Sequence, residues 1–119
     1  YLQYTYARAS RIIEKSGITP SIKSEYAKKL TDSSEIALIK EISKFDLIVE
    51  DAANNLAPKI VARYLFHLVS LFNAFYEKIP VLKEKDEDTK LGRIAMIKAF
   101  QVVIQNGLQI LGINATEKI

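Results

Sequence analysis

The stretch that decides the fold is PKIVARYLFHLVSLFNAFYE, residues 58–77. Polar residues recur along it at steps of three and four, and the positions between them are mostly apolar: the polar ones are Lys59, Arg63, His67, Ser70, Asn73 and Glu77. A single polar stripe on an otherwise apolar helix indicates a helix that is buried on most sides. Pro58 suits the first turn of such a helix. We therefore predict a central helix of roughly five turns, against which the rest of the chain packs.

Two other segments show helical periodicity. In residues 1–16 the core side is predicted to consist of Leu2, Tyr6, Ala9 and Ile13, with Gly17 as the stop. Residues 91–111 carry a polar stripe and an apolar stripe, formed respectively by Lys98, Gln101, Gln105 and Gln109 and by Ile97, Phe100, Ile104, Leu108 and Leu111. Gly112 can adopt the left-handed conformation that ends a helix. Both segments are therefore expected to lay one apolar face on the core.

The remaining segments are shorter. Asp32 and Glu35 have the spacing of a capping box, which predicts the start of a helix. A bend is expected near residues 44–46, and the apolar face then continues from Phe45 to Leu56. The lysine-rich residues 22–30 are expected to form a loop with a helical turn, and the charged residues 83–90 a connection before the last helix. Helices joined by short links predict an all-α fold, an antiparallel helical bundle.

Length and composition limit the possible functions. The chain has 119 residues, of which 49% are hydrophobic, so we expect a single domain over residues 1–119 with its own core. It contains no cysteine, which excludes disulfides and thiolate chemistry and is natural in a cytoplasmic protein. Its apolar runs are too short to cross a bilayer, so no membrane partner is predicted. The net charge of +3 is compatible with a polyanionic partner but does not require one.

Motifs for catalysis are missing from the sequence. There is no glycine-rich phosphate loop, no zinc-binding HExxH and no nucleophile with a matching base. The single histidine, His67, lies on the polar stripe of the central helix and has no second histidine or cysteine with which to share a metal ion. We therefore predict no catalytic, cofactor-binding or metal site, and no enzymatic activity for this chain alone.

The first helix has a face of a different kind. Tyr1, Tyr4, Arg8, Arg11 and Lys15 follow helical spacing, so aromatic rings and cations share one side. Proteins that bind single-stranded RNA loops use such faces, because rings stack on splayed bases and arginine contacts phosphates or stacks through its guanidinium plane. The same pattern also fits tyrosines that pack on a neighbouring helix beside cations that are only solvated. The pattern alone favours this second interpretation.

Other residues have both structural and functional interpretations. Tyr76, near the end of the central helix, either closes the end of the bundle, which the pattern favours, or presents its ring to a ligand. Asn106 is flanked by apolar residues and is expected to lie on a buried side, where its amide would bond backbone across a helix interface. Gly107 and Gly112 are also predicted to have structural roles.

Four separated segments resemble one family. They are YLQYTYAR (residues 1–8), NLAPKIVARYLFHLVSLFNAFYEKIPVL (55–82), Arg93 to Val103, and QNGLQILGINATEKI (105–119). In order and spacing they are similar to the DALR anticodon-binding domain of arginyl-tRNA synthetases, with cysteinyl enzymes and the glycyl β subunit as more distant relatives. The last segment also resembles the C-terminus of these enzymes, so the chain is expected to be a C-terminal fragment of a larger synthetase.

This resemblance implies a function and a set of site residues. The parent would be a class I aminoacyl-tRNA synthetase that attaches arginine to its tRNA; ATP and magnesium would bind only to its catalytic domain, and no cofactor to this one. By similarity, Tyr1, Tyr4 and Arg8 face the anticodon loop, Tyr76 supports an anticodon base, and Ile119 closes the same pocket. The partners implied are arginine tRNA and the catalytic domain of the same chain.

A second function remains open from the sequence. The chain could be a helical protein-interaction module whose exposed tyrosines meet a catalytic domain or a synthetase complex. The two functions differ at Arg8, because its removal should weaken RNA binding but should matter little to a largely apolar protein interface.

Overall fold

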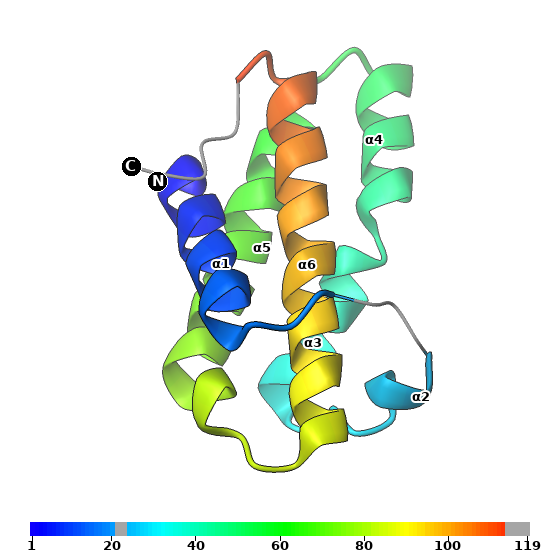
Figure 1. The fold of residues 1–119 in the computed structure, drawn as a ribbon. Coiled ribbons are helices and arrows are strands. Elements are labelled where there is room, and N and C mark those ends of the chain that lie inside the picture. Colours follow the sequence, from blue (N-terminus) through cyan, green and yellow to red (C-terminus); the bar gives the residue numbers. More distant parts are fainter. Residues whose placement is uncertain (21–23, 114–119) are drawn as a thin grey trace.

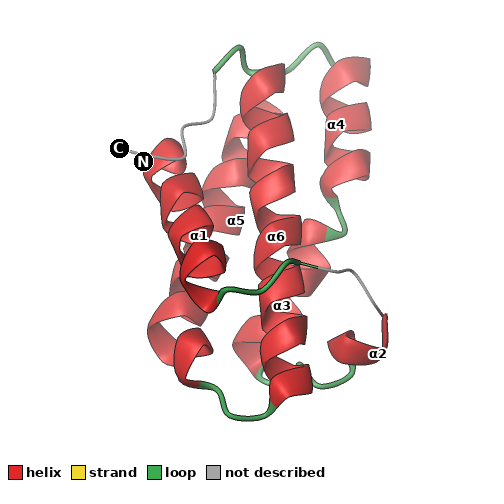
Figure 2. Cartoon of the chain, viewed as in Figure 1, coloured by secondary structure: helices red, strands yellow, loops and turns green. Residues whose placement is uncertain are grey.

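The computed structural model describes residues 1–20 and 24–113 and is built from helices (Figure 1). In chain order these are α1 (Leu2–Ser16), α2 (Ser24–Ala27), α3 (Ser33–Ile42), α4 (Phe45–Asn54), α5 (Lys59–Lys78), the short 3-10 helix η1 (Val81–Lys83) and α6 (Glu87–Ile110). No strand occurs in these residues (Figure 2), which confirms the predicted all-α fold. Helices α5 and α6 run antiparallel through the middle of the bundle, and α1 packs against both (Figure 1).

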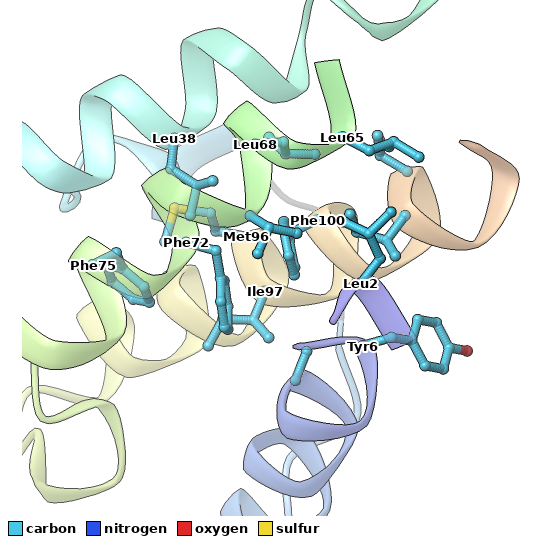
Figure 3. Packing of buried hydrophobic residues seen from close by; sticks show 14 of the residues in the cluster. Leu2, Tyr6, Leu38, Leu65, Leu68, Phe72, Phe75, Met96, Ile97 and Phe100 are labelled. Atoms are coloured by element: carbon cyan, nitrogen blue, oxygen red, sulfur yellow. The ribbon is translucent and has the colours of Figure 1, made fainter. Parts of the chain in front are cut away.

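The core is formed mainly where α5 meets α6. The Phe72 and Phe100 rings stack with their centroids 4.2 Å apart and their planes at 8°, and both side chains are fully buried (Figure 3). Nearer the other end of the interface, a Cβ added to Gly107 would lie 2.7 Å from Leu65 Cδ2, so the absence of a side chain there lets the two helices approach. The central position of α5 is thus confirmed, with α6 as its partner.

Several helix boundaries follow from local sequence. Asp32 and Glu35 form the predicted capping box of α3, and Gly17 takes the left-handed conformation (φ 68°) at the end of α1. At the end of α6, Gly112 is also left-handed (φ 78°), and the Ile113 backbone N–H donates to the Leu108 carbonyl at 2.8 Å. These turns set the directions in which the chain enters and leaves the bundle.

Some expectations about faces and boundaries were wrong. Helix α6 begins at Glu87, because the carboxylate of Asp86 accepts from the Thr89 backbone N–H at 3.0 Å and caps it, so half of the predicted charged connection is helical. Gln101 is buried rather than solvated, since α1 covers that side and its amide donates to the Ser10 hydroxyl. Leu56 takes φ 49° in the turn after α4 and is 89% exposed, so it does not continue the apolar face.

An unpredicted ion pair joins the elements at one end of the bundle. The Arg93 Nε donates to Glu35 Oε2 at 2.7 Å, and the Arg93 Nη1 lies 3.5 Å from Glu84 Oε1. The side chains of Arg93 and Glu35 are 13% and 1% exposed, so this pair lies inside the protein. It ties α3 to α6 and to the segment that follows η1, which in turn borders the cleft described next.

None of the helices in the described ranges combines the length and the apolar character that spanning a membrane requires.

Candidate nucleic-acid interface

An open cleft of about 720 Å³ lies between α1, the C-terminal end of α5 and η1. One wall is the face of α1 on which Tyr4, Arg8, Arg11 and Lys15 follow one another at helical spacing, as the sequence predicted. The other wall is formed by Tyr76 and the segment that leads from it through η1 to Lys83. Segments about 70 residues apart in the chain therefore form one concave surface, which helical periodicity alone could not indicate.

Arg8 occupies the centre of this surface. Its guanidinium carbon lies 5.3 Å from the centroid of the Tyr4 ring and 4.5 Å from the centroid of the Tyr76 ring, within the range of cation–π contacts. Its Nη1 donates a hydrogen bond to the Asn73 side-chain oxygen at 3.3 Å. The arginine is thus held between two tyrosines and still has further N–H donors available for a ligand.

Tyr1 extends the surface beyond Asn73. Its hydroxyl accepts a hydrogen bond from the Asn73 Nδ2 at 3.1 Å, and its ring stacks on Phe66 with centroids 6.1 Å apart and planes at 13°. Both rings remain largely open to solvent, Tyr1 at 68% and Phe66 at 52% exposed. Asn73 therefore connects Tyr1 to Arg8, and the two lie on one continuous surface.

The tyrosines are available to a ligand as well as packed. Tyr4 is 46% exposed, and Tyr76 is 40% exposed although its ring also stacks on the buried Phe72 with centroids 6.4 Å apart. Tyr76 thus both seals the end of the bundle and presents ring surface to the cleft, so the two interpretations of this residue are compatible. Tyr1, Tyr4, Arg8 and Tyr76 come together, whereas Ile119, the remaining candidate, lies outside the described residues.

The charge of the cleft is strongly positive. Among the residues that the structure describes, five cations and one acid line it: Arg8, Arg11, Lys15, Lys78 and Lys83, with Glu77 as the acid. Lys78 is already paired, since its Nζ lies 3.0 Å from Asp32 Oδ1. The hydrogen bond from the Ser34 hydroxyl and, to a smaller extent, this contact with Lys78 lower the pKa of the Asp32 carboxyl to about 2. For Arg11, Lys15 and Lys83, no carboxylate of the described residues lies within ion-pair distance.

Three contributors to this surface were not predicted as site residues. Two of them, Phe66 and Asn73, lie seven residues apart on α5 and so share one side of that helix. The predicted residue Tyr76 follows Asn73 by three positions and lies on the same side. This spacing was a usable signal, but it became meaningful only once α1 was known to cross that side. Lys83 joins the cleft through η1, in a charged run that was interpreted as a solvated loop.

The prediction that Asn106 lies on a buried side of the last helix is wrong. Asn106 is exposed, and so are the apolar residues one turn before and after it, Val102 at 39% and Ile110 at 48%. The three residues share an outward-facing stripe of α6, so the apolar neighbours did not mark a buried side. Its neighbour Gly107 is the residue that faces α5.

In the residues that the structure describes, no group of three or more His, Cys, Asp or Glu side chains is placed so that it could hold a metal ion. His67 lies on the surface 3.7 Å from Glu41 Oε2. What the cleft offers is exposed aromatic surface, a preorganised guanidinium and positive charge, a combination suited to a flexible polyanion with planar groups.

Comparisons of the sequence with known proteins agree on one family. The profile of the DALR anticodon binding domain matches residues 2–119. The arginine-tRNA ligase of Methanosarcina acetivorans is 37% identical over 98% of this chain and 21% of its own length, and that of Aeropyrum pernix is 40% identical over 99% of this chain and 18% of its own length. The chain therefore spans about a fifth of the length of these relatives.

Comparison with solved structures agrees with the sequence comparison. The arginyl-tRNA synthetase of Thermus thermophilus superposes on all of this chain with a TM-score of 0.85 at 29% identity, using 21% of its own chain. A putative arginyl-tRNA synthetase from Campylobacter jejuni superposes with a TM-score of 0.81 at 20% identity, which supports the fold. The helical arrangement described above thus recurs as one part of much longer chains.

Proposed function

The chain belongs to the DALR anticodon-binding domain family, and on this premise we propose that it binds the anticodon loop of arginine tRNA. The binding surface is the one that contains Tyr1, Tyr4, Arg8 and Tyr76, to which Ile119 is added by family resemblance alone. The observation that carries the proposal is Arg8, held between two half-exposed tyrosine rings at the centre of a positively charged cleft.

The chemistry of this surface suits unstacked bases. An anticodon loop can splay its bases outward, and each base that stacks on an aromatic ring gains about 1–3 kcal/mol. Tyr4 and Tyr76 supply such rings, and the free N–H groups of Arg8 can donate to a base edge or a phosphate. We propose that the base read here is the central cytosine that arginine anticodons share.

In its parent protein the domain would select the tRNA and perform no chemistry. The parent that we propose is an arginine-tRNA ligase of the cytoplasm, whose catalytic domain binds ATP and magnesium and joins arginine to the tRNA. This agrees with the relatives being arginine-tRNA ligases and with the chain covering only about a fifth of their length. The surface described here would then act only by placing the correct tRNA on the enzyme.

Titration with short RNAs tests the proposal. The probes are an arginine anticodon stem-loop and the same stem-loop with a changed central base, each added to the chain and to its Arg8→Ala and Tyr76→Ala variants. We expect a preference for the central cytosine that both variants reduce by roughly fivefold or more, since each loses about 1–3 kcal/mol of stacking or charge. The matched control is Arg63→Ala, an exposed arginine of α5 that does not line the cleft.

Two outcomes would contradict the proposal. Equal binding of both stem-loops, or no binding of either, would leave the protein-interaction function, in which the same tyrosines dock on another domain. An equal loss in Arg63→Ala and Arg8→Ala would show that only net charge matters.

A further inference from the structure

The cleft divides into two parts with different chemistry. The part around Arg8 has both tyrosine rings, whereas the part beyond it contains Arg11 and Lys15 on α1 and Lys83 on η1. Arg11 and Lys15 are one helical turn apart, about 6 Å along the axis. The end of α1 that carries them lies beside the end of α5 (Figure 1), and η1 follows directly from α5. Cations from both walls therefore line the same part of the cleft.

These three cations have no internal task that the structure shows. No carboxylate in the described ranges pairs with them, whereas the other two cations of the cleft are engaged: Lys78 with Asp32 and Arg8 with Asn73 and the tyrosines. Uncompensated like charges on facing walls repel one another, which is unfavourable in the free protein. An anion that bridges them would relieve this repulsion.

We propose that Arg11, Lys15 and Lys83 form a binding site for the sugar-phosphate backbone of the RNA strand whose base stacks beside Tyr4 and Tyr76. The inference rests on the proposed function, since it names the part of the RNA that the second half of the cleft binds. Phosphate contacts orient a nucleic acid without reading its sequence, and base contacts supply the selectivity. The stacking half of the cleft therefore selects the base, and the basic half fixes the path of the strand.

An abasic probe separates the two halves. The arginine anticodon stem-loop with an abasic central nucleotide keeps every phosphate but has no base to stack. The chain, the triple variant Arg11→Ala/Lys15→Ala/Lys83→Ala and the Tyr76→Ala variant are titrated with the intact and the abasic stem-loops over a range of salt concentrations. The triple variant should weaken binding of both probes by the same factor, roughly tenfold or more at low salt, whereas Tyr76→Ala should weaken only the intact probe.

Salt dependence gives an independent readout. Each cation that neutralises a phosphate of a single strand contributes about 0.7 to the slope of log affinity against log salt, so the triple variant should lower that slope by about 2. The control is Lys40→Ala/Lys59→Ala/Lys98→Ala, which removes the same charge at exposed positions outside the cleft and should change the slope by less than half as much.

Each outcome decides a separate question. If the control triple variant changes the slope as much as the cleft variant does, the backbone site is overturned while the proposed function stands. If the cleft variant loses selectivity for the central base instead of overall affinity, the division of the cleft is wrong. If no stem-loop binds the unmodified chain at all, the proposed function fails, and the backbone site fails with it.

Discussion

At the scale of single residues, the arrangement around Arg8 explains why an arginine in this position is useful. A guanidinium at the edge of a protein loses conformational entropy when it binds, and two ring contacts and one hydrogen bond here restrict it in advance. Each cation–π contact at an exposed site contributes about 0.5–1 kcal/mol. The gain is preorganisation, since the remaining N–H groups of the guanidinium stay available to donate hydrogen bonds to RNA.

Asn73 is predicted to be a positioning residue for this surface. Its oxygen accepts from Arg8 and its amide donates to the Tyr1 hydroxyl, so Asn73→Ala releases both side chains. We expect binding of the arginine anticodon stem-loop to weaken by roughly two- to tenfold, the value of one or two net hydrogen bonds. Calorimetric titration of the variant and of the unchanged chain measures this.

A double-mutant cycle provides the control for Asn73. If Asn73 acts through Arg8, then Asn73→Ala should add little to the loss already caused by Arg8→Ala. Asn73→Asp keeps an acceptor for the guanidinium and should retain the preference for the central base, while its added negative charge lowers the overall affinity. Fully additive losses in the cycle would exclude the positioning role.

The same residue shows where sequence reasoning ends. Helical spacing placed Asn73 on the polar side of α5 correctly, but its partner Tyr1 is 72 positions away in the chain. Periodicity describes a helix and its own faces, and not which neighbour covers them. The prediction for Asn106 was wrong for a related reason, because apolar neighbours in the sequence need not be buried. By contrast, the α1 face with Tyr4 and Arg8 needed only local spacing, and it was predictable.

At the scale of elements, boundaries that depend on local chemistry were predictable. The capping box of α3, the glycine stops and the proline start of α5 all require only a few adjacent residues. The start of α6 was missed because its cap, Asp86, stands among many charged residues that also suit a loop. Glu35 was expected only to cap α3, and its burial against Arg93 depends on how α3 and α6 meet.

The buried ion pair between α3 and α6 should be important for stability. Arg93→Ala leaves the Glu35 carboxylate buried, with the Asp32 backbone N–H as its one hydrogen-bond donor among the described residues, so we expect the free energy of unfolding to fall by roughly 3–5 kcal/mol. Adding Glu35→Gln should recover part of this loss, because a neutral amide is less costly to bury. Urea unfolding of the single and double variants measures both effects.

A surface pair serves as the comparison. Lys44 and Glu41 lie 3.4 Å apart with Lys44 largely exposed, and Lys44→Ala should cost at most about 1 kcal/mol. A loss of that small size in Arg93→Ala would mean that water reaches Glu35 and that the pair does not tie the two helices together.

The cap of α3 makes stability depend on pH in the acid range. Hydrogen bonds from the Ser34 hydroxyl and from Lys78 lower the pKa of Asp32 from 3.8 to about 2 in the folded protein. Because the folded pKa is the lower one, the contribution is complete above the unfolded pKa near 4 and is lost as the pH falls toward 2. Asp32→Asn keeps a capping side chain but does not titrate, so its melting temperature should fall less between pH 5 and pH 2.

Circular dichroism melts at several pH values test this dependence. The pKa of Asp86, which caps α6, is also lowered, first by the hydrogen bond from the Thr89 hydroxyl. Asp32→Asn/Asp86→Asn should therefore reduce the acid dependence further than Asp32→Asn alone. An unchanged pH profile in both variants would show that other groups cause the acid sensitivity.

At the scale of the whole molecule, the cleft exists only because three elements meet. Helix α1 supplies one wall, and the C-terminal end of α5 and η1 together form the other. The 3-10 helix is held in place by its position between α5 and α6, and the Glu84 carboxylate that follows it contacts Arg93. The composition and the periodicities of the chain predicted the bundle, but a concave surface between distant segments requires the packed structure.

The chain spans about a fifth of the length of its relatives, and this leads to a prediction about affinity. If the parent that we propose also contacts the tRNA elsewhere, anticodon binding becomes intramolecular once the first contact has formed. Tethered sites commonly gain roughly 10²- to 10⁴-fold in apparent affinity without any new contact. The parent should therefore bind arginine tRNA far more tightly than the chain alone, while both should lose the same factor when the central anticodon base is changed. Parallel filter-binding titrations of the two proteins with both tRNAs measure these ratios. A base change that weakens the parent but not the isolated chain would place the selectivity outside this domain.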